Sequence, residues 1–243
     1  MTQDPTLADL IGGADRTCWP RLHDQRRAER IDPVLKDAGA SEAVAELMRR
    51  AASASPYLER LILRQSASLH SLLAGSPEDT LERLLAETAA APVPADEVKL
   101  WLRRHKDQVM LLLSLCDLSG VWSDQLIMEN LSHFADAAIT AAFQSAIATI
   151  LGSDDAVLEE SGIALLAMGK YGAYELNYSS DIDIVVFYAP DILADYLAAH
   201  DSAAEPRRMA VKATQLAVAI LQDQTQDGYV FRTDLRLRPD PGT

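Results

Sequence analysis

The sequence predicts an α+β protein in which a helical region is followed by a small mixed sheet. From about residue 41 to residue 151, apolar residues recur at spacings of three and four, as in amphipathic helices. From Gly152 onward, short apolar runs rich in β-branched residues are separated by loops, which is typical of buried strands. We therefore expect a helical region over residues 1–155 and a sheet-containing core over residues 156–243.

Helix starts are marked clearly in the first region. Ser55-Pro56 and Ser76-Pro77 each place a capping serine before a proline suited to the first helical turn. The apolar stripe over residues 58–73 predicts one helix, and a second stripe over residues 98–113 predicts another. A long helix is expected after Gly120. Together these segments predict a helical bundle or layer.

The second region combines three expected strands with one helix. Ile163–Met168 is a short continuous apolar run, and Ile182–Tyr188 is β-branched and aromatic. Pro206–Gln222 has a helical stripe, and residues 229–237 alternate in polarity as a strand does. The last ten residues resemble a strand that stops in a turn, so we expect the chain to be a fragment of a longer protein.

Composition excludes several classes of protein. Hydrophobic residues make up 49% of the 243 residues and charged residues 24%, which is ordinary for a globular chain. No run approaches the length of a membrane span, and the first ten residues hold two acids and no basic leader, so neither a span nor a secretory signal is expected. The net charge of −14 disfavours binding to nucleic acid.

Cysteine and histidine usage argues against a structural metal. Cys18 and Cys116 are too few for a disulfide framework or a metal cluster, and they fit a reduced, cytoplasmic compartment. The five histidines are scattered without ligand spacing, so zinc is not expected. His105 lies on an apolar stripe and is expected to be a hydrogen-bonded core residue, and Cys116 is expected to be structural.

Two carboxylates, Asp181 and Asp183, stand two residues apart at the start of the second expected strand. A period of two places both on one face of the sheet, while Ile182 and Ile184 face the opposite, buried side. Adjacent carboxylates repel each other unless a cation lies between them, and hard oxygen ligands suit Mg²⁺. The pair is therefore predicted to bind Mg²⁺; the alternative is a strand edge with solvated acids.

Asp234 is the candidate for a third carboxylate. Alternation along its strand places it on one face with Arg232, Arg236 and Arg238. One acid among three arginines is a poor pattern for a core and a good one for a site. Three carboxylates suffice to hold two metal ions, and arginines suit phosphates. The alternative is a surface ladder in which the arginines pair with acids.

Glycines directly after the first expected strand indicate a phosphate-binding loop. Gly169 and Gly172 permit close backbone approach, and free N–H groups at such a junction attract phosphate. Lys170 would add a positive charge, and Ser180 would bind phosphate or cap the strand entry. A plain glycine turn and a solvated lysine are both common, so neither indicates a site by itself. What indicates one is their order, with Gly169 and Lys170 followed by the acid-apolar-acid-apolar run from Asp181 to Ile184.

The segment MGKYGAYELNYSSDID from Met168, together with RTDLRLRP from Arg232, resembles the polymerase β-type nucleotidyltransferase superfamily. Within that superfamily, the sequences of these two motifs most resemble those of the bifunctional glutamine synthetase adenylyltransferase/adenylyl-removing enzymes. In that family two such domains lie in one long chain. The N-terminal domain removes AMP from a tyrosine of glutamine synthetase by phosphorolysis, and the C-terminal domain attaches AMP from ATP. The start at Met1 and the long helical region before the motif resemble the N-terminal half.

The resemblance implies a nucleotidyltransferase-like core at residues 156–243 with Mg²⁺ as its cofactor. The residues it implies for catalysis and metal binding are Asp181, Asp183 and Asp234. Those expected to contact phosphate or nucleotide are Gly169, Lys170, Ser180, Arg236 and Arg238. The implied partners are glutamine synthetase as protein substrate, a PII signalling protein as regulator, orthophosphate and adenine nucleotides.

The implied reaction is attack of orthophosphate on the phosphorus of AMP, with the tyrosine oxygen as leaving group and ADP as product. Two alternatives stay open. One is an adenylyltransferase that attaches AMP from ATP to glutamine synthetase, because the same carboxylates would serve either direction. The other is a non-catalytic fragment that docks to glutamine synthetase or to the PII protein.

Overall fold

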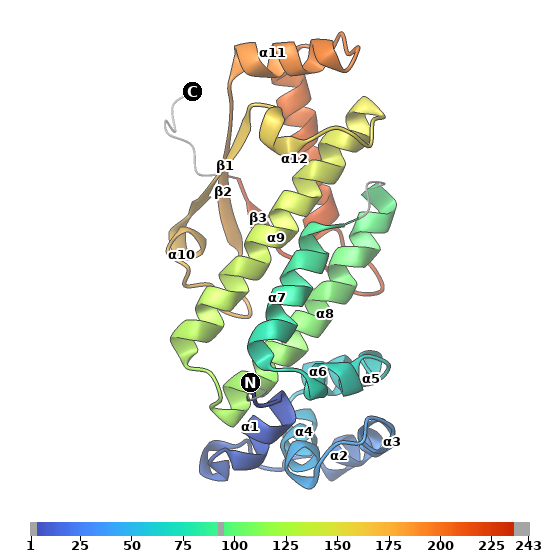
Figure 1. Ribbon diagram of the computed structural model, residues 1–243, viewed down its shortest axis with the longest axis vertical. Helices are drawn as coiled ribbons and strands as arrows, with labels where there is room; N and C mark the ends of the chain where they lie inside the picture. Colours follow the sequence, from blue (N-terminus) through green and yellow to red (C-terminus); the bar gives the residue numbers. More distant parts are fainter. Residues whose placement is uncertain (1–3, 92–94, 236–243) are drawn as a thin grey trace. The chain divides into compact units, whose positions relative to one another are not determined.

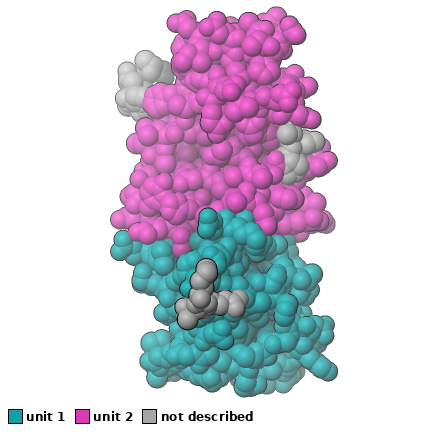
Figure 2. Space-filling view, in the orientation of Figure 1, with its two compact units in different colours: residues 1–84, 106–127 teal, residues 85–105, 128–243 magenta. Residues whose placement is uncertain are grey.

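The computed structural model describes residues 4–91 and 95–235 (Figure 1). The protein is α+β, as predicted: most of the described residues are helical, and a three-stranded mixed sheet lies toward the C-terminus. The chain divides into two compact units, Met1–Leu84 with Lys106–Ile127 as unit 1, and Leu85–His105 with Met128–Thr243 as unit 2 (Figure 2).

The described residues of unit 1 form helices joined by short connections, with no strand among them. Its own elements are α1 (Leu7–Gly13), the 3-10 helix η1 (Arg16–Cys18), α2 (Gln25–Arg30), α3 (Asp32–Asp37), α4 (Glu42–Ala54), α5 (Pro56–Arg64) and α6 (Leu69–Ala74). Three more helices have residues in both units, namely α7 (Pro77–Ala89), α8 (Ala95–Ser119) and α9 (Asp124–Leu151). The unit boundaries therefore fall inside helices, and the division at residues 155/156 stays a prediction.

Helix capping follows the sequence signals. The Ser55 side chain accepts from the N–H of Leu58, and Ser76 Oγ accepts from the N–H of Asp79, so both predicted helix starts are confirmed. The single helix predicted over residues 58–73 is wrong, because α5 ends at Arg64 and α6 begins at Leu69. Ser68 Oγ bonds the backbone oxygen of Gln65, a local contact that competes with helix continuation.

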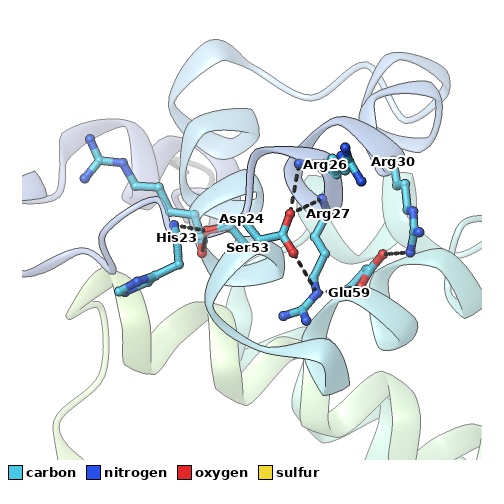
Figure 3. Close-up of polar contacts among 8 residues, drawn as sticks. His23, Asp24, Arg26, Arg27, Arg30, Ser53 and Glu59 are labelled. Atoms are coloured by element: carbon cyan, nitrogen blue, oxygen red, sulfur yellow. Dashed lines mark hydrogen bonds and ion pairs between the residues drawn. The ribbon is translucent and has the colours of Figure 1, made fainter.

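A buried carboxylate joins α2 and α5 in unit 1 (Figure 3). Glu59 is 6% exposed and lies 3.0 Å from Arg30 Nη1 and 3.6 Å from Arg27 Nε. Asp24, the N-cap of α2, accepts from the N–H of Arg27 and so orients the start of that helix. Two cations around one buried acid offset its loss of hydration. The network is structural and lies among helices that carry none of the predicted site residues.

Unit 2 carries the sheet. Its remaining elements are the 3-10 helix η2 (Leu158–Glu160), β1 (Ile163–Met168), α10 (Gly169–Gly172), β2 (Ile182–Tyr188), α11 (Pro190–Ala199), α12 (Pro206–Gln222) and β3 (Thr233–Asp234). The predictions of β1, β2 and α12 are confirmed, and α11 was not predicted. The last strand begins later than predicted, at Thr233, because the N–H groups of Val230 and Phe231 donate to the oxygen of Leu221 and not to a neighbouring strand. Residues 236 and 237 of the predicted strand lie outside the described residues.

The sheet has the order β1-β2-β3, with β1 antiparallel and β3 parallel to β2. One face is apolar: Ile182 and Ile184 are buried, and Ile184 shares cavity linings with α9 and with α12. On the other face, Leu166 and Phe187 are about half exposed, at 49% and 50%. Asp183 lies between Ile182 and Ile184 along β2 and pairs with Met168 of β1. Because side chains alternate along a strand, Asp183 lies on this open face.

Helix α9 is long and apolar enough to be a candidate membrane span, but 61% of its most apolar window is buried inside the structure. Phe134 and Phe143 are fully buried, and the Phe134 ring lies 5.7 Å from that of Phe231. This burial is typical of the core helix of a globular unit. His105 is also buried as predicted, with Nδ1 2.9 Å from the oxygen of Trp101. Cys116 is fully buried, which raises the pKa of its thiol and fits its predicted structural role.

A buried guanidinium fixes the turn that leads into β3. Arg103 on α8 is 1% exposed and donates to the oxygens of Lys99 (2.8 Å), Ile220 (3.1 Å) and Gly228 (2.8 Å), and to that of Asp223. Burial lowers the pKa of Arg103, and the nearby carboxylate of Asp223 opposes that shift. The carbonyls of Ile220, Asp223 and Gly228 lie at the end of α12 and in the turn after it, so Arg103 holds the segment that leads to β3.

Replacing Arg103 with leucine should cost about 3 kcal/mol or more of unfolding free energy, because several buried carbonyls lose their donor. Urea denaturation followed by circular dichroism measures this. The control is Lys99→Ala, which removes only the partly exposed Lys99–Asp223 ion pair and should cost less than about 1 kcal/mol. Equal costs for the two variants would contradict the assignment of Arg103 as the anchor of this turn.

Candidate metal and phosphate site

The loop after β1, residues 169–176, begins directly against a carboxylate of β2. Gly169 has φ +58°, in the left-handed region that glycine adopts readily. A Cβ at this position would lie 2.7 Å from Asp183 Oδ2. Glycine is therefore needed here for space as well as for backbone conformation. The backbone at Gly169 makes a close approach, as predicted. The group it approaches is Asp183, one of the predicted metal-binding carboxylates.

Asp183 and Asp234 lie opposite each other on neighbouring parallel strands. The register pairs Asp183 with Asp234 and Ile182 with Thr233. Both aspartates are half-buried, and residues paired in this way share one face of the sheet. Like charges directly opposite each other destabilise a sheet, and a cation between them removes the repulsion. The structure thus brings together two of the three predicted ligands, from segments about fifty residues apart.

Asp181 is placed differently from the other two. It precedes β2, and its Oδ1 accepts from Arg232 Nε at 2.5 Å, with side chains 49% and 59% exposed. Arg232 also donates to the oxygen of Ser179, and its own oxygen accepts from the N–H of Ile182. A carboxylate has about four acceptor positions, so the Oδ2 of Asp181 is left for a cation.

The donor set fits Mg²⁺ better than a fully protein-coordinated ion. Within residues 4–91 and 95–235, no three His, Cys, Asp or Glu side chains are grouped closely enough to hold a metal. Mg²⁺ keeps several waters and is commonly bound by one or two carboxylates plus substrate phosphates. Asp183 and Asp234 supply two such carboxylates beside a glycine loop. The residues present therefore fit an ion that is completed by a phosphate-bearing substrate.

The other predicted contact residues are placed as follows. Lys170 is exposed on α10, one residue after Gly169. Ser180 is half-buried, and its Oγ accepts from the N–H of Asn177 at 3.1 Å, which closes the turn before Asp181. Arg236 and Arg238 lie outside the residues that the structure describes. Roles in phosphate or nucleotide binding stay predictions for all four.

Sequence reasoning missed a contact between α9 and the loop after β1. The hydroxyls of Tyr171 and Tyr174 donate to Oδ1 and Oδ2 of Asp136, at 2.5 and 3.0 Å. Both tyrosines belong to the motif, but nothing in the sequence connects them to an aspartate 35 residues earlier. Only the packing of α9 against the loop shows which acid they bind.

Comparison with known proteins gives one consistent result. The profile of a family described as glutamate-ammonia ligase adenylyltransferase matches residues 38–243. Similar curated proteins are bifunctional glutamine synthetase adenylyltransferase/adenylyl-removing enzymes. That of Rhodopseudomonas palustris strain CGA009 is 38% identical over 98% of this chain, and that of Caulobacter vibrioides is 39% identical over 95%. That of Bradyrhizobium sp. strain ORS 278 is 41% identical over 86%.

The matched part of these relatives is limited. The chain spans 24% of the length of the Rhodopseudomonas and Caulobacter proteins and 22% of the Bradyrhizobium protein. Their names combine two opposed activities in one protein. Similarity therefore establishes the family, while the activity carried by this chain has to be argued from its site.

Replacing Asp183 or Asp234 with asparagine should weaken Mg²⁺ binding at least about tenfold, because a ligand charge is lost. In the metal-free chain Asp183→Asn should raise the free energy of unfolding by up to about 1 kcal/mol, since it removes a like charge opposite Asp234. Calorimetric titration and urea denaturation measure the two effects. Asp195→Asn, an exposed acid on α11, is the control and should change neither. Unaltered Mg²⁺ affinity in both site variants would refute the metal assignment.

Gly169→Ala tests whether the site needs the free space beside Asp183 or only the left-handed backbone conformation of the glycine. Gly152→Ala is its matched control, because Gly152 also has positive φ, at +67°, but has nothing within 4 Å of an added Cβ. Both variants should lose about 1–2 kcal/mol of unfolding free energy for the left-handed conformation. Only Gly169→Ala should push the Asp183 carboxylate aside and weaken Mg²⁺ binding about tenfold. Equal Mg²⁺ affinities would show that the close approach has no role in the site.

Proposed function

The chain belongs to the glutamate-ammonia ligase adenylyltransferase family, and on that premise we propose that it removes AMP from an adenylylated tyrosine of glutamine synthetase by Mg²⁺-dependent phosphorolysis. The observation that carries this proposal is the Asp183–Asp234 pair beside the Gly169 loop. Two carboxylates in register suit a metal that contacts a phosphate, and the glycine leaves room for one. The proposal places the chain in the cytoplasm with a PII signalling protein as its regulator.

The reaction exchanges one phosphorus–oxygen bond for another. An oxygen of orthophosphate attacks the phosphorus of AMP, the bond to the tyrosine oxygen breaks, and the tyrosine hydroxyl takes up a proton as ADP leaves. Mg²⁺, when bound, would neutralise charge on the transferring group. Asp183 and Asp234 would hold the ion. We assign Asp181 as the third carboxylate, which would join them once its Oδ1 is released from Arg232. The glycine backbone at residue 169 keeps the space beside Asp183 free of side-chain atoms.

Positive charge near the carboxylates would select phosphate over water as the attacking group. Arg232 stands next to Asp181 and is more than half exposed. Lys170 directly follows Gly169. We also assign Arg236 and Arg238 to phosphate binding, because they alternate with Asp234 in the sequence. Ser180 supports the site by closing the turn that presents Asp181.

Attachment of AMP is the second candidate. The family description names an adenylyltransferase, and the relatives carry both activities in their names. In transfer of AMP from ATP, the tyrosine oxygen attacks the α-phosphorus, the hydroxyl proton is lost, and pyrophosphate rather than orthophosphate is the group released. The carboxylate pair serves both directions equally, so the products formed are what distinguishes them.

Incubating the chain with Mg²⁺, orthophosphate and glutamine synthetase labelled on its AMP group should release labelled ADP. Release should depend on added phosphate, because water lacks the charge that basic side chains bind. Thin-layer chromatography of the products measures this, and the matched Asp183→Asn variant should release none. Free AMP that is independent of phosphate would indicate a hydrolase. Incorporation of AMP from ATP into unmodified glutamine synthetase would indicate the adenylyltransferase instead.

A further inference from the structure

One carboxylate on α9 holds two hydroxyls of the loop after β1. Asp136 accepts from Tyr171 at 2.5 Å and from Tyr174 at 3.0 Å, one hydroxyl on each oxygen. Burial, followed by the hydrogen bond to Asp136, raises the pKa of Tyr171, and that hydrogen bond also raises the pKa of Tyr174. Both tyrosines are therefore protonated donors at neutral pH. Hydrogen bonds to an ionised acceptor are roughly twice as strong as neutral ones.

Other contacts reach the loop from the same turn of α9. The N–H of Leu176 donates to Ser132 Oγ at 3.4 Å, and the Leu176 side chain is 1% exposed. The ring of His133 lies 5.1 Å from the ring of Tyr174, with its Nδ1 3.8 Å from Asp136 Oδ2. Helix α9 thus contacts the loop from residue 171 to residue 176, with Asp136 as the only acid among these contacts in the described structure.

The loop is folded tightly and at a conformational cost. Tyr174 has φ +58°, a left-handed conformation that is unusual and strained for an aromatic residue. A Cβ on Gly172 would lie 2.5 Å from the oxygen of Ala167. The N–H of Glu175 donates to the oxygen of Lys170 at 2.8 Å. Such a conformation persists only where other contacts hold it, and the Tyr174 hydroxyl supplies one.

A pocket of about 350 Å³ adjoins the contact, and residues lining it include Asp136, Thr140, Leu165, Ala167, Tyr171 and Tyr174. The Tyr171 side chain is only 5% exposed, so burial of its ring holds α10 together with the hydrogen bond to Asp136. Tyr174 is 40% exposed, so its ring has less packing and its position depends more on the hydrogen bond. The hydrogen bonds to Asp136 therefore add direction to a contact that packing alone does not orient.

We propose that Asp136 is a positioning residue that, through Tyr171 and Tyr174, holds α10 so that Gly169 stays against the Asp183 carboxylate and the phosphate space keeps its size. The chain from Gly169 to Tyr171 is a single helical turn, so a shift of the tyrosine moves the glycine with it. This inference rests on the proposed function and deepens it. It assigns the control of orthophosphate binding to a helix that carries none of the catalytic residues.

Removing single hydroxyls from the 243-residue chain tests the proposal. Tyr171→Phe and Tyr174→Phe each delete one donor to Asp136 and keep the ring. Tyr196→Phe is the matched control in the same unit, since its hydroxyl accepts from the N–H of Val157 at 2.7 Å, away from the loop. In the phosphorolysis assay, the two loop variants should raise the KM for orthophosphate about tenfold with little change in the KM for adenylylated glutamine synthetase. Tyr196→Phe should change neither.

Amide hydrogen exchange gives a second readout that is independent of activity. Exchange of the Ala173 and Glu175 amides should become faster in the loop variants, while amides of β1 and β2 keep their rates. Asp136→Ala should have the combined effect of both tyrosine variants, because it removes the acceptor of both hydroxyls. Adding the tyrosine changes to Asp136→Ala should have no further effect on loop exchange.

The outcomes separate this proposal from the proposed function. Loop exchange and KM values that match those of Tyr196→Phe overturn the positioning role. Loop exchange that does not respond overturns it whether or not the wild-type chain produces ADP. A wild-type chain that releases no ADP, in which loop exchange still responds to the tyrosine variants, overturns phosphorolysis and leaves Asp136 as the residue that holds the loop.

Discussion

The repulsion between Asp183 and Asp234 is the constraint on which the arrangement of unit 2 depends. Two carboxylates in register on adjacent strands are unfavourable in a sheet, so their placement has to be maintained by the structure around them. Ile182 and Ile184 bury the opposite face of β2 and thereby keep both acids on the open face. A one-residue change of register would put Asp183 into the core, where an unpaired charge is strongly disfavoured.

Two charged side chains from the long helices hold the backbone segments that meet at this pair. Arg103 on α8 binds the carbonyls that precede β3, and Asp136 on α9 binds the tyrosines that follow β1. Each group has several partners, which offsets the loss of hydration that a charge suffers in a partly buried position. The helices thus do more than cover the sheet. Helix α8 holds the segment that leads to Asp234, and helix α9 holds the loop that lies against Asp183.

Local patterns explain which parts were predictable. The runs of β1 and β2 and the stripe of α12 extend over whole elements, so their bounds follow from neighbouring residues alone. The break between α5 and α6 coincides with local hydrogen bonds between Ser68 and Gln65, and the late start of β3 with bonds to the end of α12. The aspartates were recognisable by their spacing within a motif. Asp136 was not, because only tertiary packing relates it to tyrosines 35 and 38 residues away.

The carboxylate pair and the loop have different consequences for the direction of the chemistry. Metal ions held by Asp183 and Asp234 would stabilise the transferring phosphoryl group whichever nucleophile attacks it, so the pair cannot favour one direction. A preference for orthophosphate has to arise where the incoming group is bound. In the function proposed above, Gly169 forms one wall of that space, and Tyr171 and Asp136 hold it in position. Within one family, domains with the same acids can therefore differ in reaction through contacts that support the loop rather than through the catalytic residues themselves.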